Sequence, residues 1–168
     1  MEGSTTIKII TSDGQKFELP REIIDSAESD FMKQLGDEPD EEVTIKEEEC
    51  KLWCFEKILE FFNKYKTLPI PTQDYPLKSE SLEEHGLSGD LKWYADFVES
   101  LEFRKLYELY ITANYFMFKP LVELCAMAIA AHWRKAEKVN GIQGIRDLLG
   151  IEHGFTEEEL NAKMPDED

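Results

Sequence analysis

Long apolar runs, paired cysteines and positive charge are all scarce in this sequence of 168 residues. No stretch approaches the ~18 apolar residues that a membrane-spanning helix needs, and residues 1–6 lack the basic and apolar regions of a signal peptide. Three cysteines are too few, and odd in number, for a disulfide framework. We therefore expect an intracellular protein with reduced thiols and no membrane span.

Negative charge dominates the composition. The chain has 19 Lys and Arg against 36 Asp and Glu, which gives a formal net charge of −17. Such a surface repels phosphate backbones and anionic lipids, so we expect neither a nucleic-acid partner nor a membrane partner. The acidity serves either solubility or steering toward a basic partner. With 42% apolar and 11% aromatic residues, the composition is still that of a globular protein.

Groups of side chains that would support catalysis are also missing. The three histidines are scattered along the chain, at His85, His132 and His153. Cys50 and Cys54, four residues apart, supply only half of a zinc site. Gly141 and Gly144 lack the preceding strand that a phosphate-binding turn requires. We expect no enzymatic activity, no metal and no cofactor.

The N-terminal region predicts a small β-sheet. Residues 7–19 read as a hairpin, because Asp13-Gly14 supplies the positive φ angles of a tight turn. Ile7 and Ile9 alternate with polar neighbours, which predicts one buried face. The triplet 43–45 predicts a third strand between acidic segments.

Most of the remaining chain predicts helices. They are expected over residues 21–26, 29–35, 48–65, 93–100, 102–116, 118–135 and 141–149, and from residue 156 onward. Residues 67–90 are rich in Pro, Gly and Ser and predict a mobile loop with no apolar face to bury. The whole pattern predicts an α/β protein, with a first domain over residues 1–135 and a helical extension over residues 136–168.

Helix 102–116 is apolar on almost every side, and helix 118–135 is similar. A helix of this kind is either deeply buried or places one face against another protein. Two interpretations stay open, a helical core and an apolar surface kept for partners. We favour the surface, because a chain of this size cannot bury both helices together with helix 48–65.

Three runs carry a resemblance to a known family, in the same order along the chain. Ile7–Leu19, Leu106–Leu121 and Gly144–Glu159 resemble the hairpin, the helix pair and the C-terminal region of the S-phase kinase-associated adaptors of SCF ubiquitin ligases. The resemblance implies a BTB/POZ fold followed by helices that bind an F-box. It also implies a non-enzymatic adaptor, in the cytoplasm and nucleus, that links the N-terminal domain of a cullin to F-box proteins for substrate ubiquitination and degradation.

The resemblance also implies roles for individual residues. It places Val43, Ile45, Asn114 and Tyr115 against the cullin. It places seven residues against the F-box: Tyr107, Tyr110, Ile111, Ile129, Ile145, Leu149 and Phe155. The family usually carries a Trp-Cys pair in a terminal helix, and this sequence has no such pair after Glu159. The alternative is therefore a divergent relative with weakened F-box binding that acts as a scaffold and forms a homodimer when free.

Overall fold

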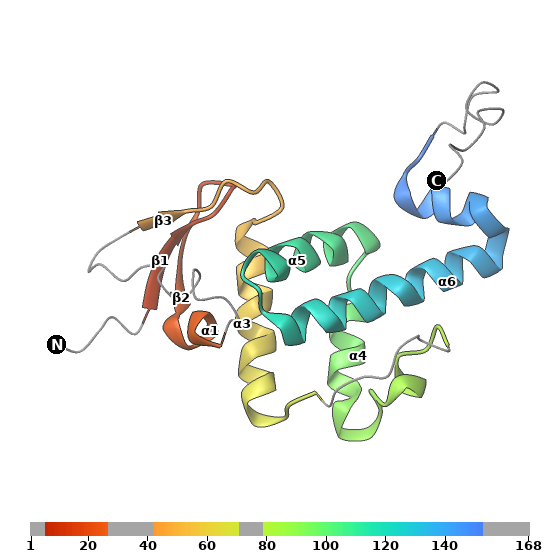
Figure 1. The fold of residues 1–168 in the computed structure, drawn as a ribbon, viewed down its shortest axis with the longest axis horizontal. Coiled ribbons are helices and arrows are strands. Elements are labelled where there is room, and N and C mark those ends of the chain that lie inside the picture. The colour runs from red at the N-terminus through yellow and green to blue at the C-terminus, as the bar shows by residue number, and fades with distance from the viewer. Residues whose placement is uncertain (1–5, 27–41, 71–78, 153–168) are drawn as a thin grey trace, which may run out of the picture. The chain divides into compact units, whose positions relative to one another are not determined.

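The computed structural model of the chain describes residues 6–26, 42–70 and 79–152, and it divides the chain into two units, one up to His132 and one from Trp133. The elements are β1 (Thr6–Ile10), β2 (Lys16–Pro20), α1 (Arg21–Asp25), β3 (Glu42–Thr44), α3 (Leu52–Thr67), α4 (Lys92–Glu99), α5 (Phe103–Tyr115) and α6 (Lys119–Leu149) (Figure 1). The predicted α/β class is confirmed. The helices expected over residues 29–35 and from residue 156 lie outside the described residues.

The first unit contains a three-stranded sheet in the order β2-β1-β3. β1 and β2 form the predicted antiparallel hairpin, in which Ile7 lies opposite Leu19 and Ile9 opposite Phe17. Ile7, Ile9 and Leu19 are buried, so the predicted alternation of the hairpin is confirmed. β3 pairs with β1 in the parallel sense, which the triplet at residues 43–45 could not reveal by itself.

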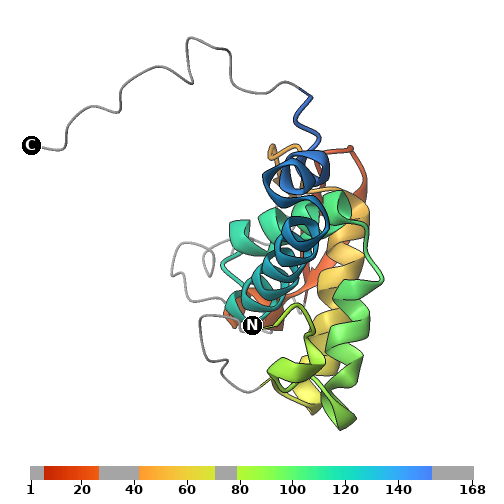
Figure 2. The same ribbon diagram turned by 90° about the vertical axis from the view of Figure 1, so that its right-hand side faces the viewer.

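Helix α3 carries most of the aromatic core. It contacts β2 and α5 and lies beside α4 (Figures 1 and 2). The ring of Phe61 lies 5.5 Å from Tyr94 of α4 and 5.6 Å from Phe118, both edge to face. Phe55 meets Phe116 at 5.5 Å. Rings held edge to face in this way stabilise a core beyond the area they bury.

The loop predicted over residues 67–90 needs a correction in its described part. Two short 3₁₀ helices, Glu83–His85 and Gly89–Leu91, lie before α4. Leu82 and Leu87 are completely buried, so this part does have apolar side chains to bury. Mobility of the whole stretch stays a prediction, and residues 71–78 lie outside the described residues.

Helix α6 crosses the division between the units and is interrupted at Asn140 and Gly141. Gly141 has φ +55° and ψ −140°, a conformation open essentially to glycine. Past the bend, a Cβ atom on Gly144 would lie 2.1 Å from the carbonyl oxygen of Ala136, so only glycine fits there. Gly141 and Gly144, which the sequence did not support as a phosphate-binding turn, therefore form a helical bend within the second unit.

Candidate interaction surfaces

The C-terminal end of α5 exposes polar and apolar side chains together. Asn114 is exposed, Tyr115 is half-buried, and Val43 in β3 is also half-buried. Burial raises the pKa of Tyr115, and the nearby Cys50 and Glu47 raise it further, so its hydroxyl stays neutral and can donate a hydrogen bond. The expectation for Ile45 is corrected, because this side chain is only 2% exposed and belongs to the core.

Met117 terminates α5 in an unusual way. Its N–H donates to the Asn114 carbonyl at 2.9 Å, and the Phe118 N–H donates to the Ala113 carbonyl at 2.9 Å. This pattern is a Schellman motif, whose turn residue has a positive φ and is usually glycine. Met117 has φ +50° and is the only described non-glycine residue with a positive φ. Its side chain is 47% exposed.

The same motif occurs twice more with the expected residue. Gly86 follows the first 3₁₀ helix, and Gly150 follows α6, each with a positive φ and with the two hydrogen bonds of the motif. The chain therefore uses glycine at two of these turns and methionine at the third. A non-glycine residue in the left-handed region costs about 1–2 kcal/mol relative to the right-handed region. Strained residues cluster at functional sites, which makes the Met117 side chain a candidate for a functional role.

A second surface lies along α5. Tyr107, Tyr110 and Ile111 lie three and four residues apart, so they share one face of the helix. The rings of Tyr107 and Tyr110 stack with their centroids 6.3 Å apart. Tyr107 is 46% exposed, whereas the other two are half-buried. The helix is therefore both core and surface, since Leu106, Leu109 and Ala113 are completely buried on its other side.

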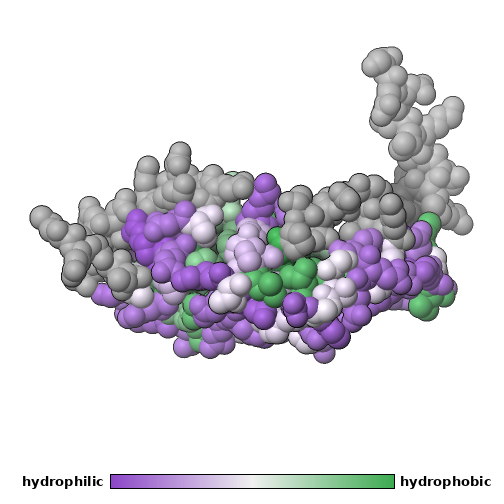
Figure 3. Space-filling view, turned by 90° about the horizontal axis from the view of Figure 1, so that it is seen from below, coloured by the Kyte–Doolittle hydropathy of each residue, from purple (hydrophilic) through white to green (hydrophobic). Residues whose placement is uncertain are grey.

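The remaining residues assigned to an F-box lie in different parts of the chain. Ile129 is half-buried in the first unit. Ile145 is half-buried and Leu149 is 43% exposed in the second unit. Phe155 lies outside the described residues. The described part of the second unit also exposes four large apolar side chains that the resemblance had not assigned: Trp133, Val139, Ile142 and Ile151. Across the face drawn in Figure 3, most of the surface is hydrophilic, with a hydrophobic patch near its middle.

A third feature is a buried carboxylate surrounded by cations, which we call the Glu108 cluster: Lys51, Trp53, Arg104, Lys105 and Glu108. Glu108 on α5 is only 5% exposed. Its Oε1 accepts from Lys51 Nζ at 3.0 Å, and its Oε2 accepts from Trp53 Nε1 and Lys105 Nζ, each at 3.2 Å. Arg104 Nε lies 3.9 Å from Oε1. The Lys105 ammonium lies 4.5 Å above the Trp53 ring.

The cations set the protonation state of Glu108. Burial alone would raise its pKa, but the hydrogen bonds from Lys51 and Lys105 outweigh burial and hold the pKa below its ordinary value. The Glu108 hydrogen bond in turn raises the pKa of Lys51. Sequence reasoning missed this cluster. Only the spacing of Arg104 and Lys105, four and three residues before Glu108, could have indicated it.

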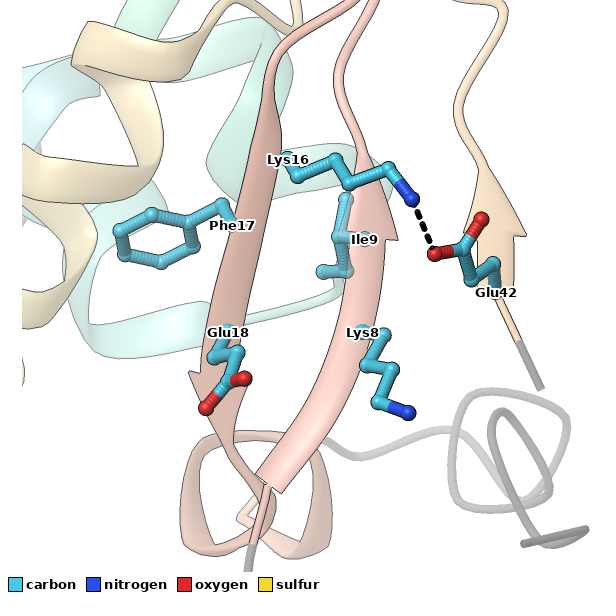
Figure 4. A pocket seen from close by; sticks show the side chains of 6 residues that line it. All are labelled: Lys8, Ile9, Lys16, Phe17, Glu18 and Glu42. Atoms are coloured by element: carbon cyan, nitrogen blue, oxygen red, sulfur yellow. Dashed lines mark hydrogen bonds and ion pairs between the residues drawn. The ribbon is translucent and has the colours of Figure 1, made fainter. Parts of the chain in front are cut away.

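A hollow lies on the outer face of the sheet (Figure 4). Lys16 reaches from β2 across β1 and pairs with Glu42 on β3 at 2.5 Å. Lys8 lies opposite both Glu18 and Glu42 in the strand registers. Phe17 points away from this charged face (Figure 4). Opposite charges that alternate across neighbouring strands are typical of a solvated sheet surface, and the hollow carries no chemistry beyond that.

The cysteines do not form a reactive site. Burial raises the pKa of both Cys50 and Cys54 to about 11, so their thiols stay protonated at neutral pH. In the described parts of the chain, no three metal-binding side chains lie close enough together to hold an ion. Nor does any helix there have the length and apolarity to cross a membrane.

These features describe a small α/β protein whose helices present aromatic and apolar side chains at the surface, which is typical of protein-binding modules. No protein-family model matches the chain. The chain is similar to the S-phase kinase-associated protein 1 homolog of Tetrahymena thermophila, with 27% identity over 94% of this chain and 89% of that protein. It is also similar to SKP1-like protein 10 of Arabidopsis thaliana, with 27% identity over 94% of this chain and 93% of that protein. The resemblance to this family is confirmed over nearly the whole chain.

Proposed function

We propose that this protein is a non-enzymatic adaptor with a BTB/POZ fold that links a cullin to F-box proteins in an SCF-type ubiquitin ligase. It would act in the cytoplasm and nucleus. The similarity to S-phase kinase-associated proteins over 94% of the chain supports this role. The observation that carries most weight is the strained, exposed Met117 beside Asn114 and Tyr115.

The C-terminal end of α5 is the proposed cullin surface. Asn114 offers an amide, Tyr115 a neutral hydroxyl, and Met117 an apolar side chain. An interface of this kind gains most of its affinity from a few buried aromatic and apolar anchors. Methionine adapts its shape to a partner more readily than branched side chains do. The cost of a positive φ at Met117 is then offset by contacts that glycine could not make.

Each unit by itself offers residues for F-box binding: the residues proposed in the first unit are Tyr107, Tyr110, Ile111 and Ile129, and those proposed in the second unit are its exposed apolar residues. Leu149 and Ile142 are exposed there. Apolar side chains exposed in this number on a short helical segment favour a partner that covers them. A self-associating relative with weakened F-box binding remains the second candidate, and the same exposed apolar residues favour it.

Met117→Gly tests cullin binding without the risk that a loss of affinity merely reflects misfolding. Glycine removes the side chain and relieves the strained φ, so the fold should become more stable while affinity for the cullin N-terminal domain falls. Tyr115→Ala should cost about 2 kcal/mol of binding free energy in calorimetry if the ring is a buried anchor. Asn114→Ala should also weaken cullin binding, and Asn63→Ala is its control, because both are exposed helical asparagines.

A parallel titration with an F-box peptide separates the two surfaces. Tyr107→Ala and Leu149→Asp should weaken F-box binding and leave cullin binding unchanged, and Tyr115→Ala should do the opposite. If wild-type protein binds neither partner and sediments as a dimer, the scaffold alternative replaces the adaptor. If Met117→Gly and Tyr115→Ala both leave cullin affinity intact, the cullin surface lies elsewhere.

A further inference from the structure

The Glu108 cluster holds more positive charge than its carboxylate requires. Three cations surround one buried carboxylate, which leaves two positive charges in excess. One cation would be enough to balance Glu108. Each further cation repels the first at close range. In a chain with a net charge of −17, the five residues of this cluster together carry positive charge.

The cluster also keeps unused hydrogen-bond donors. An ammonium group has three donors, and Lys51 and Lys105 each direct one at Glu108. Arg104 approaches only through Nε at 3.9 Å, which is beyond hydrogen-bond distance, and its side chain is 89% exposed. A guanidinium group has five donors in a fork that matches a carboxylate. Arg104 therefore presents its donors to the solvent.

We propose that the Glu108 cluster binds an acidic segment of a partner protein, with Arg104 as the main contact and Lys51 and Lys105 as flanking cations. The same donors already hold one carboxylate, so a second carboxylate is a ligand that their geometry accommodates. Glu108 fixes both lysines between α3 and α5, which lowers the entropy lost on binding. A polynucleotide is disfavoured by the negative charge of the rest of the chain.

The test uses a fluorescein-labelled peptide of alternating Glu and Gly, with fluorescence anisotropy at low ionic strength. The variant Arg104→Gln changes a side chain that is almost fully exposed, so the fold should be kept; Arg104→Gln with Lys105→Gln removes two charges. The matched control is Arg134→Gln with Lys135→Gln, the same residue types in the same order on an exposed part of α6. Neither a cullin nor an F-box protein is present, so the result does not depend on the proposed function.

We expect the double variant at Arg104 and Lys105 to bind the peptide about tenfold more weakly than wild type, since it loses two charge-assisted contacts. The matched control should stay within about twofold, and added salt should weaken wild-type binding. The proposal is overturned if wild type does not bind, if a Gln-Gly peptide binds equally, or if both double variants lose affinity alike. It is also overturned if inorganic phosphate displaces the peptide at lower concentrations than acetate does, because the site would then prefer phosphate.

Discussion

Replacing Glu108 by Gln would measure what the buried carboxylate contributes to stability. Gln has almost the same size and can still accept the Trp53 N–H, but it cannot balance the charges of Lys51 and Lys105. Removing one partner of a fully buried ion pair costs about 3–5 kcal/mol. Both lysines are partly exposed and can turn toward water. We therefore expect a loss of about 1–2 kcal/mol in the free energy of unfolding at neutral pH.

The pH dependence gives this prediction a second, independent test. The pKa of Glu108 is lower in the folded protein than in the unfolded chain, so its stabilisation is fully present above the unfolded pKa of about 4.3. The stabilisation is lost as the pH falls through the lower folded pKa. The difference between wild type and Glu108→Gln should thus be constant near neutrality and shrink in acid.

Urea unfolding followed by circular dichroism, at a series of pH values, measures both quantities. The other carboxylates also become protonated in acid, which changes the stability of both proteins alike. Taking the difference in unfolding free energy between the two proteins at each pH removes this shared change. Glu56→Gln, on the exposed side of α3, is the control and should change stability by less than about 0.5 kcal/mol. The reasoning fails if Glu108→Gln is as stable as wild type at neutral pH, or if the difference between them does not change in acid.

Three further predictions concern stability and can be checked by the same unfolding measurements. Asp13→Ala removes the acceptor of the Leu52 N–H at the start of α3 and should cost about 1 kcal/mol, whereas Asp13→Asn should cost less. A hydrogen bond from Thr11 lowers the Asp13 pKa, so this contribution should disappear as the pH falls below about 3.9. Met117→Gly should stabilise the protein by about 0.5–1 kcal/mol, seen as a higher melting temperature; an unchanged or lower value would mean that the φ is not strained. Leu82→Ala should cost about 2–4 kcal/mol, and a loss near zero would mean that this segment is not packed.

Local signals in the sequence were sufficient for most of the elements. The Asp13-Gly14 turn and the alternation of Ile7 and Ile9 predicted the hairpin, because turn geometry and strand period are properties of neighbouring residues. Helix α5 was predicted over residues 102–116 and runs from Phe103 to Tyr115. The break in α6 was also anticipated, since separate helices were expected on either side of Gly141.

Two of the contacts that the sequence did not reveal join residues far apart in the chain. Lys51 and Glu108 are separated by 57 positions, and Asp13 and Leu52 by 39. No period or spacing can indicate such pairs. Leu82 was misjudged for a related reason: an isolated leucine among Ser, Gly and acidic residues looks like loop sequence, and only its three-dimensional neighbours make it a core residue. The resemblance assigned Ile45 to the cullin surface, but the side chain is buried, and burial too depends on the whole fold.

The strongest indication of function is Met117, which occupies the positive-φ position of a Schellman turn where glycine is usual. Three turns share the Schellman geometry, and two of them use glycine. At the third, methionine adopts a conformation that glycine would adopt at lower cost, and its side chain is 47% exposed rather than buried in the core. Since we expect Met117→Gly to stabilise the fold, folding alone does not explain the methionine at this position. Such a position is expected where function, rather than folding, determines the residue. Met117 thus adds support to the proposal, first suggested by the resemblance at Asn114 and Tyr115, that the end of α5 is the cullin surface.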